Sequence, residues 1–225
     1  MYKCCIFDLD GTLVNSIYAL QRSVNETLNI WGFRELTLEE TRQFVGDGYK
    51  KLLERSLLAC GDETLSHYEE AVERYEGIFK ECCLYRVEAY EGIRELLQFL
   101  KEQGICTAVL SNKPHARTLD NVNGVFGETV FDRVYGERES QGIRKKPCPD
   151  GVWAIGEELG FLREELLYLG DTNTDMETGA NAGVDTVGVT WGFRSREELA
   201  AFHPVLLADR PKQVMDYIKE VNRIE

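Results

Sequence analysis

Short apolar runs, separated by segments of helical periodicity, constrain the fold of this chain most. The runs do not alternate apolar with polar residues, as a strand that faces water on one side does, so we predict strands buried on both faces. These predicted strands are residues 3–7, 107–110, 130–135, 166–169 and 186–189. Strands that alternate with helices are joined by right-handed crossovers into a parallel sheet. The sequence therefore predicts an α/β fold with helices on both faces of a parallel sheet.

One long stretch breaks this alternation, because no predicted strand interrupts the segment from about Ser16 to Glu88. Its apolar residues recur at helical spacing, and the run from Thr37 to Glu40 resembles a capping box that starts a helix. We therefore expect an inserted α-helical cap domain at residues 16–88 and an α/β core domain at residues 1–15 and 89–225. An insert after the first strand lies above the carboxyl edge of the sheet, where open α/β folds bind ligands.

Charge and cysteine usage limit the partners. The 225 residues include 26 Lys and Arg against 39 Asp and Glu, which gives a formal charge of −13 and no basic stripe for nucleic acid or an anionic membrane surface. No apolar run approaches the length of about 20 residues that a membrane span needs. The 7 cysteines form no C-x-x-C pair, so we expect reduced thiols in a cytoplasmic protein. The sequence indicates no oligomeric state.

Polar residues gather where the predicted strands end. Parallel strands bring their carboxyl ends to one edge of the sheet, so we expect these side chains to lie together. After the first strand come Asp8, Asp10 and Gly11, whose backbone freedom suits a sharp turn beside a ligand. The others follow later strands or precede the helix at Pro149: Ser111, Asn112, Lys113, Lys146, Asp171 and Asp175.

Carboxylates crowded at one edge need a counter-cation, because two of them about 4 Å apart repel by roughly 4 kcal/mol at an effective dielectric of 20. Oxygen ligands without a His or Cys cluster favour Mg²⁺. The Ser111 hydroxyl, backbone N–H groups and the Lys146 cation would then hold a phosphoryl group. Asp8 would attack phosphorus to form an aspartyl-phosphate, and Asp10 would serve as general acid and then general base.

Each of these residues also has an ordinary structural explanation. Asp-Gly is a common turn dipeptide, and Ser111 or Asp171 would serve equally well as a helix N-cap. Lys146 lies in a basic run that water would solvate. Their shared position at one sheet edge favours the catalytic interpretation over separate coincidences.

The same residues resemble the motifs of the haloacid dehalogenase superfamily, in its phosphoglycolate-phosphatase-like branch with a helical cap and a Rossmann-like core. The matching segments run from Asp8 to Leu13, from Val109 to Lys113, from Lys146 to Pro149 and from Gly170 to Asp175. The resemblance implies that Asp8, Asp10 and Asp171 bind Mg²⁺, and that Asp10 does so through its backbone carbonyl. By the same resemblance, Asp175 acts on the metal through water or orients Lys146. It also implies phosphate binding by Ser111, Asn112, Lys146 and Gly11.

The resemblance narrows the reaction to phosphoryl transfer, because dehalogenating members lack an acid/base residue at the position of Asp10. We expect a phosphatase acting on a small phosphorylated metabolite, with phosphoglycolate as the leading candidate. A phosphosugar mutase and a pyrophosphatase of the same superfamily remain alternatives. A phosphoacceptor signalling module similar to a response-regulator receiver, or a catalytically inactive binding protein, represents a different class.

The leaving group would be selected by the cap. The segment from Phe44 to Lys51 contains two glycines that allow a turn toward the core, and a similar segment of the family faces the active site. We expect Gly46, Gly48 and Lys50 to lie near the substrate. Cap closure would exclude water from the aspartyl-phosphate step and requires hinge motion near Asn15 and Glu88.

Overall fold

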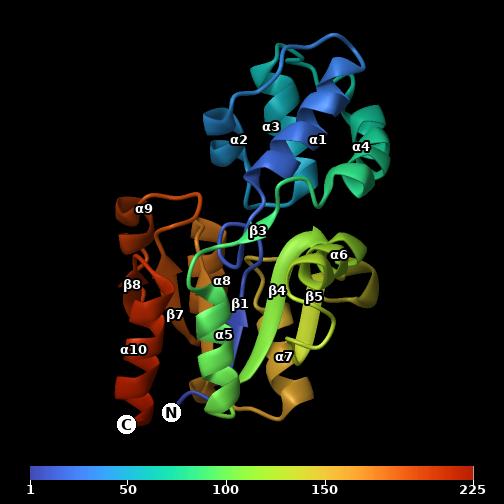
Figure 1. The fold of residues 1–225 in the computed structure, drawn as a ribbon. Helices are drawn as coiled ribbons and strands as arrows, with labels where there is room; N and C mark the ends of the chain where they lie inside the picture. The colour runs from blue at the N-terminus through green and yellow to red at the C-terminus, as the bar shows by residue number, and fades with distance from the viewer. Residues whose placement is uncertain (225) are drawn as a thin grey trace.

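A computed structural model describes residues 1–224 of the chain. Six parallel strands form the main sheet, which confirms the predicted fold class (Figure 1). Their spatial order is β5 (Arg133–Glu137), β4 (Cys106–Pro114), β1 (Cys4–Phe7), β6 (Leu166–Gly170), β7 (Asp185–Val189) and β8 (Leu206–Ala208). The central strand β1 pairs with β4 on one side and β6 on the other, so the carboxyl ends of these three strands are adjacent.

Three strands of the main sheet differ from the sequence-based expectation. We expected a strand over 107–110, but β4 continues to Pro114, so Ser111, Asn112 and Lys113 lie within the strand and not after it. We expected a strand over 130–135, but β5 begins at Arg133. The carboxylate of Asp132 accepts a hydrogen bond from the backbone N–H of Thr107 at 2.8 Å, so a side chain occupies the place of a ladder bond just before β5. Strand β8 was not predicted, because three residues are too few to show a period.

Helices cover both faces of the sheet. Alternate residues of β1 point to opposite faces: Cys5 and Phe7 join the apolar core beneath one helical layer, and Cys4 and Ile6 join the other. The first layer includes α5 (Ile93–Glu102) and α10 (Pro211–Asn222), and the second includes α7 (Asp150–Leu159) and α8 (Asn173–Ala182). The remaining helices around the sheet are α6 (His115–Val125), α9 (Arg196–Ala200) and the short 3₁₀ turns Glu139–Gln141 and Arg163–Glu165.

Four further helices form a separate unit beyond the carboxyl edge of the sheet (Figure 1). This helical unit consists of α1 (Ile17–Asn29), α2 (Leu38–Phe44), α3 (Tyr49–Ala59) and α4 (Tyr68–Cys82). It has an apolar core of its own, which Phe193 from the sheet side joins. The predicted capping box at Thr37 and Glu40 is present at the start of α2.

The chain enters and leaves the helical unit through a two-stranded antiparallel ladder. Strand β2 (Val14–Asn15) pairs with β3 (Glu88–Ala89), which holds the two connecting segments side by side. The ladder lies between the sheet and the helices in Figure 1. None of the helices formed by residues 1–224 combines the length and apolar composition required to cross a membrane.

Candidate active site

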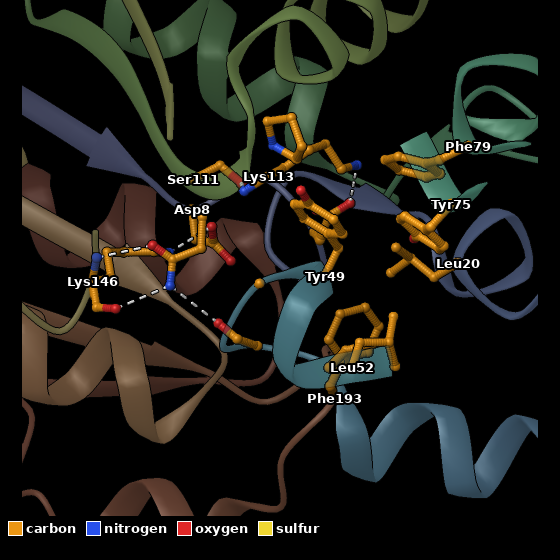
Figure 2. A pocket seen from close by; sticks show the side chains of 16 residues that line it. Asp8, Leu20, Tyr49, Leu52, Tyr75, Phe79, Ser111, Lys113, Lys146 and Phe193 are labelled. Carbon is orange, nitrogen blue, oxygen red and sulfur yellow. Dashed lines mark hydrogen bonds and ion pairs between the residues drawn. The ribbon is translucent and has the colours of Figure 1, made fainter. Parts of the chain in front are cut away.

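A pocket lies where the carboxyl ends of β1 and β4 face the helical unit. The pocket and the open solvent at its mouth together make up about 500 Å³ of empty space. Its polar end carries Lys146 and side chains that follow β1 or lie in the last part of β4, and its other end carries Phe193 and the apolar and aromatic side chains of the helical unit (Figure 2). The lining residues at the polar end are Asp8, Asp10, Ser111, Asn112, Lys113 and Lys146.

A buried lysine links two of the predicted acidic residues. The Nζ atom of Lys146 donates to Oδ1 of Asp8 at 2.7 Å and to Oδ1 of Asp175 at 2.6 Å. Asp175 is fully buried, and its carboxylate also accepts hydrogen bonds from Tyr168 and Thr172. Every oxygen of Asp175 thus has a protein donor, and Lys146 is held in place beside Asp8.

Asp171 approaches the same cluster from the end of β6. Its Oδ1 accepts from the Thr12 hydroxyl and its Oδ2 from the backbone N–H of Phe193, each at 2.8 Å. Gly11, with a φ of +89°, gives it room, because a Cβ atom at Gly11 would lie 2.2 Å from Oδ2 of Asp171. Gly11 was expected to bind phosphate, but it does not line the pocket. In this structure its lack of a side chain makes room for the Asp171 carboxylate.

The three carboxylates fit a divalent cation. Each of Asp8, Asp171 and Asp175 offers an oxygen within 4.8 Å of the others. Burial raises the pKa of Asp8 to about 7, with a further rise from Asp175 and an opposing effect of Lys146. Burial, followed by the charges of Asp175 and Asp8, also raises the pKa of Asp171. Lys146 supplies one positive charge to a cluster of three carboxylates, so a divalent cation would balance the remaining negative charge. Carboxylate oxygens are ligands that Mg²⁺ prefers.

Asp10 is held by a residue that the sequence argument did not assign a role. The Nζ atom of Lys113 donates to Oδ1 of Asp10 at 2.6 Å and also to the side chain of Asn121. The Ser16 hydroxyl donates to the same oxygen of Asp10. The signal available in the sequence was a basic residue two positions after Ser111, and the structure places both residues in β4 with both lining the pocket.

Ser111 and Asn112 have different hydrogen-bond partners. The Ser111 oxygen accepts from the backbone N–H of Lys113 at 3.2 Å, which leaves its own proton for a ligand. Asn112 pairs with both backbone groups of Lys146, accepting from its N–H at 2.9 Å and donating to its carbonyl at 3.1 Å. The Asn112 side chain thus positions the Lys146 backbone.

The segment between α2 and α3 reaches the sheet. Gly46 and Gly48 both have positive φ and both line the pocket, whereas Lys50 is exposed and does not. Asp47 accepts a hydrogen bond from the hydroxyl of Thr174 in α8 at 2.5 Å. The Arg194 guanidinium donates to three backbone carbonyls at the end of α2, those of residues 42, 43 and 45. Hydrogen bonds from Thr174 and from Arg194 therefore connect the segment between α2 and α3 to the part of the molecule that contains the main sheet.

Comparisons with known proteins identify the family of the chain. The model of the haloacid dehalogenase-like hydrolase family matches residues 5–189. A phosphoglycolate phosphatase of Haemophilus influenzae is 28% identical over 223 residues, covering 96% of this chain and 98% of that protein. One of Pseudomonas fluorescens is 30% identical over 213 residues, covering 92% and 76%. A crystal structure of a protein from Lactobacillus delbrueckii subsp. bulgaricus superimposes with a TM-score of 0.87 at 27% identity, covering 96% and 98%.

The family match spans most of the chain, including the segments with Asp8, Ser111, Lys146 and Asp171. The resemblance predicted from those segments is therefore confirmed. The chain is an enzyme of the haloacid dehalogenase-like hydrolase family and resembles the phosphoglycolate phosphatases within it.

Proposed function

We propose that the protein is a Mg²⁺-dependent phosphatase that hydrolyses a small phosphomonoester through an aspartyl-phosphate. The observation that carries this proposal is the Asp8 carboxylate in the pocket, hydrogen-bonded to a buried Lys146 and adjacent to two further buried carboxylates. A carboxylate nucleophile beside a cation and a possible metal site suits phosphoryl transfer through an aspartyl-phosphate.

The chemistry assigned to the residues is a double displacement. A carboxylate oxygen of Asp8 attacks phosphorus, the bond from phosphorus to the leaving oxygen breaks, and Asp10 gives its proton to that oxygen. Water then attacks the aspartyl-phosphate, Asp10 accepts its proton, and phosphate leaves with Asp8 restored. The Ser111 hydroxyl and the Lys146 ammonium bind the non-bridging oxygens in both steps.

Asp8, Asp171 and the backbone carbonyl of Asp10 are the proposed Mg²⁺ ligands. The bound ion would neutralise charge on the phosphoryl oxygens and on the buried carboxylates. Asp175 is assigned a supporting position, because its Oδ1 is paired with the Lys146 ammonium, whereas Asp171 accepts only from uncharged donors. It holds Lys146 toward Asp8.

The direct test is the release of phosphate from a generic aryl phosphate with Mg²⁺ and with EDTA. We expect Mg²⁺-dependent turnover that Asp8→Asn abolishes, while Asp216→Asn, an exposed position on α10, serves as the control with unchanged turnover. A protein that becomes phosphorylated without releasing phosphate would instead be a phosphoacceptor module. Phosphoglycolate, the substrate named for the relatives, is the reference alkyl substrate for the same assay.

A further inference from the structure

We propose that the leaving group of the substrate is uncharged, with an apolar face and one hydrogen-bonding group, so that the enzyme prefers such esters to a phosphomonoester with a second anionic group. This inference rests on the proposed phosphatase function and concerns the end of the pocket opposite Asp8. Three features of that end carry it: its walls, the pairing of its cations and one unpaired hydroxyl.

The wall that faces the leaving group is apolar. Figure 2 shows Asp8 and Lys146 at one end of the pocket and a group of aliphatic and aromatic side chains at the other. Phe193 reaches this wall from the sheet side, and the others belong to the helical unit: Leu20, Val45, Tyr49, Leu52, Tyr75 and Phe79. Such a surface stabilises a ligand by removing apolar area from water. The ammonium of Lys113 lies 5.4 Å from the centre of the Phe79 ring, but it is paired with Asp10.

The cations around the pocket already have acidic or carbonyl partners. Lys146 pairs with Asp8 and Asp175, and Lys113 pairs with Asp10 while also donating to Asn121. The formal charges of the residues that line the pocket therefore cancel, because two are acidic and two are basic: Asp8, Asp10, Lys113 and Lys146.

Nearby arginines do not change this balance. Arg55 is bound to Asp47 and to the carbonyl of Phe44, and Arg194 is bound to backbone carbonyls of the α2 end. Neither arginine lines the pocket. A carboxylate on the leaving group would thus exchange water for an apolar wall without a free cation, which is unfavourable.

The third feature is the hydroxyl of Tyr75. Tyr75 lines the pocket and is only 1% exposed, and its hydroxyl oxygen forms no hydrogen bond with any described residue. Its ring is stacked between Tyr49, at a centroid distance of 5.4 Å, and Phe79, at 5.3 Å. Because the ring is held on both faces, the hydroxyl has little freedom to find another partner.

Tyr49 provides the contrast within the same stack, because its hydroxyl donates to Glu76 at 2.8 Å. Burial raises the pKa of Tyr75, so its hydroxyl stays protonated and available as a donor. A buried polar group without a partner is costly, and a ligand hydroxyl, ether or carbonyl oxygen at this position would remove that cost. The hydroxyl of Tyr75 is therefore assigned to the leaving group.

Three esters of similar size test the proposal. 2-Hydroxyethyl phosphate, n-propyl phosphate and phosphoglycolate differ at the far end of the leaving group, which carries a hydroxyl, a methyl or a carboxylate. For the wild-type enzyme we expect kcat/KM for 2-hydroxyethyl phosphate to exceed that for phosphoglycolate by about tenfold or more. The ratio of kcat/KM for the hydroxyethyl ester to that for the propyl ester reports on the Tyr75 hydroxyl.

In Tyr75→Phe this ratio should fall about fivefold, as expected for the loss of one neutral hydrogen bond. It should stay at its wild-type value in Tyr135→Phe, which removes a hydroxyl that donates to Glu158 outside the pocket. A higher kcat/KM for phosphoglycolate than for the hydroxyethyl ester would overturn the proposal, because the pocket would then favour a leaving group with a second anionic group. An unchanged ratio in Tyr75→Phe would overturn it as well.

The aryl phosphate assay separates this inference from the proposed function. If Asp8-dependent hydrolysis of the aryl ester is present and phosphoglycolate is the preferred alkyl ester, the phosphatase function stands and the leaving-group inference falls. If no ester is hydrolysed in an Asp8-dependent manner, both fall.

Discussion

Replacing Lys146 with methionine tests the electrostatics on which the site depends. Lys146 is 4% exposed, and its Nζ atom lies 2.7 Å from Asp8 and 2.6 Å from Asp175. The change removes the buried cation and leaves three carboxylates with oxygens within 4.8 Å of one another. Two unit charges at that separation repel by about 3.5 kcal/mol at an effective dielectric of about 20.

Breaking a buried ion pair by removing one partner typically costs about 3–5 kcal/mol, because the remaining charge has lost its compensation. We therefore expect Lys146→Met to lower the free energy of unfolding by about that amount, measured by urea denaturation in EDTA. The double variant Lys146→Met/Asp175→Asn should lose less than Lys146→Met, since one of the uncompensated charges is gone.

Lys212→Met is the matched control. Lys212 is exposed and lies 3.2 Å from the exposed Asp216 one helical turn away, so its loss should cost less than about 0.5 kcal/mol. The reasoning would be refuted if Lys146→Met were as mild as this control. It would also be refuted if the losses of Lys146→Met and Asp175→Asn simply added in the double variant.

Three further variants probe separate parts of the site. Lys113→Met should lower kcat for alkyl phosphates by about 10- to 100-fold and for activated aryl phosphates much less, because Asp10 loses its positioning partner. Equal losses of kcat for the two kinds of ester in steady-state assays would contradict this. Gly11→Ala should lower the free energy of unfolding by more than about 2 kcal/mol, since the new Cβ would lie 2.2 Å from Asp171. It should also raise the Mg²⁺ concentration for half-maximal activity, and a Mg²⁺ titration that matches the wild type would contradict this. Arg194→Ala should raise KM about threefold or more and make residues 45–48 more sensitive to limited proteolysis, because hydrogen bonds that hold the α2 end are lost; an unchanged digestion pattern would count against that role.

Much of the core fold followed from local pattern. Runs without polar alternation predicted buried parallel strands, and five of the six strands of the main sheet lie at or near the predicted positions. The sequence pattern did not predict the strands that are too short to show a period, which are β2, β3 and β8. It misplaced the start of β5, because Asp132 bonds to the Thr107 backbone through its side chain.

The motif residues form the part of the site that the sequence could indicate. Their positions after strands implied that they share one sheet edge, and the pairing of β1 with β4 and β6 brings Asp8 beside the ends of those strands. Lys50 was expected near the substrate on the basis of its glycine-rich segment, but it is exposed outside the pocket. A helical side chain changes direction by about 100° with each residue, so sequence proximity to Gly48 did not determine its direction.

The sequence by itself determined the alternation of strands and helices, the helical insert and the residues at the strand ends, because these depend on local periodicity and chain order. Only the tertiary structure decided which groups are partners: Lys113 with Asp10, Asn112 with the Lys146 backbone, and Gly11 with the space of Asp171. It also decided that the Tyr75 hydroxyl is left without a partner. Such pairings depend on atomic distances between segments far apart in the chain, and no local pattern encodes them.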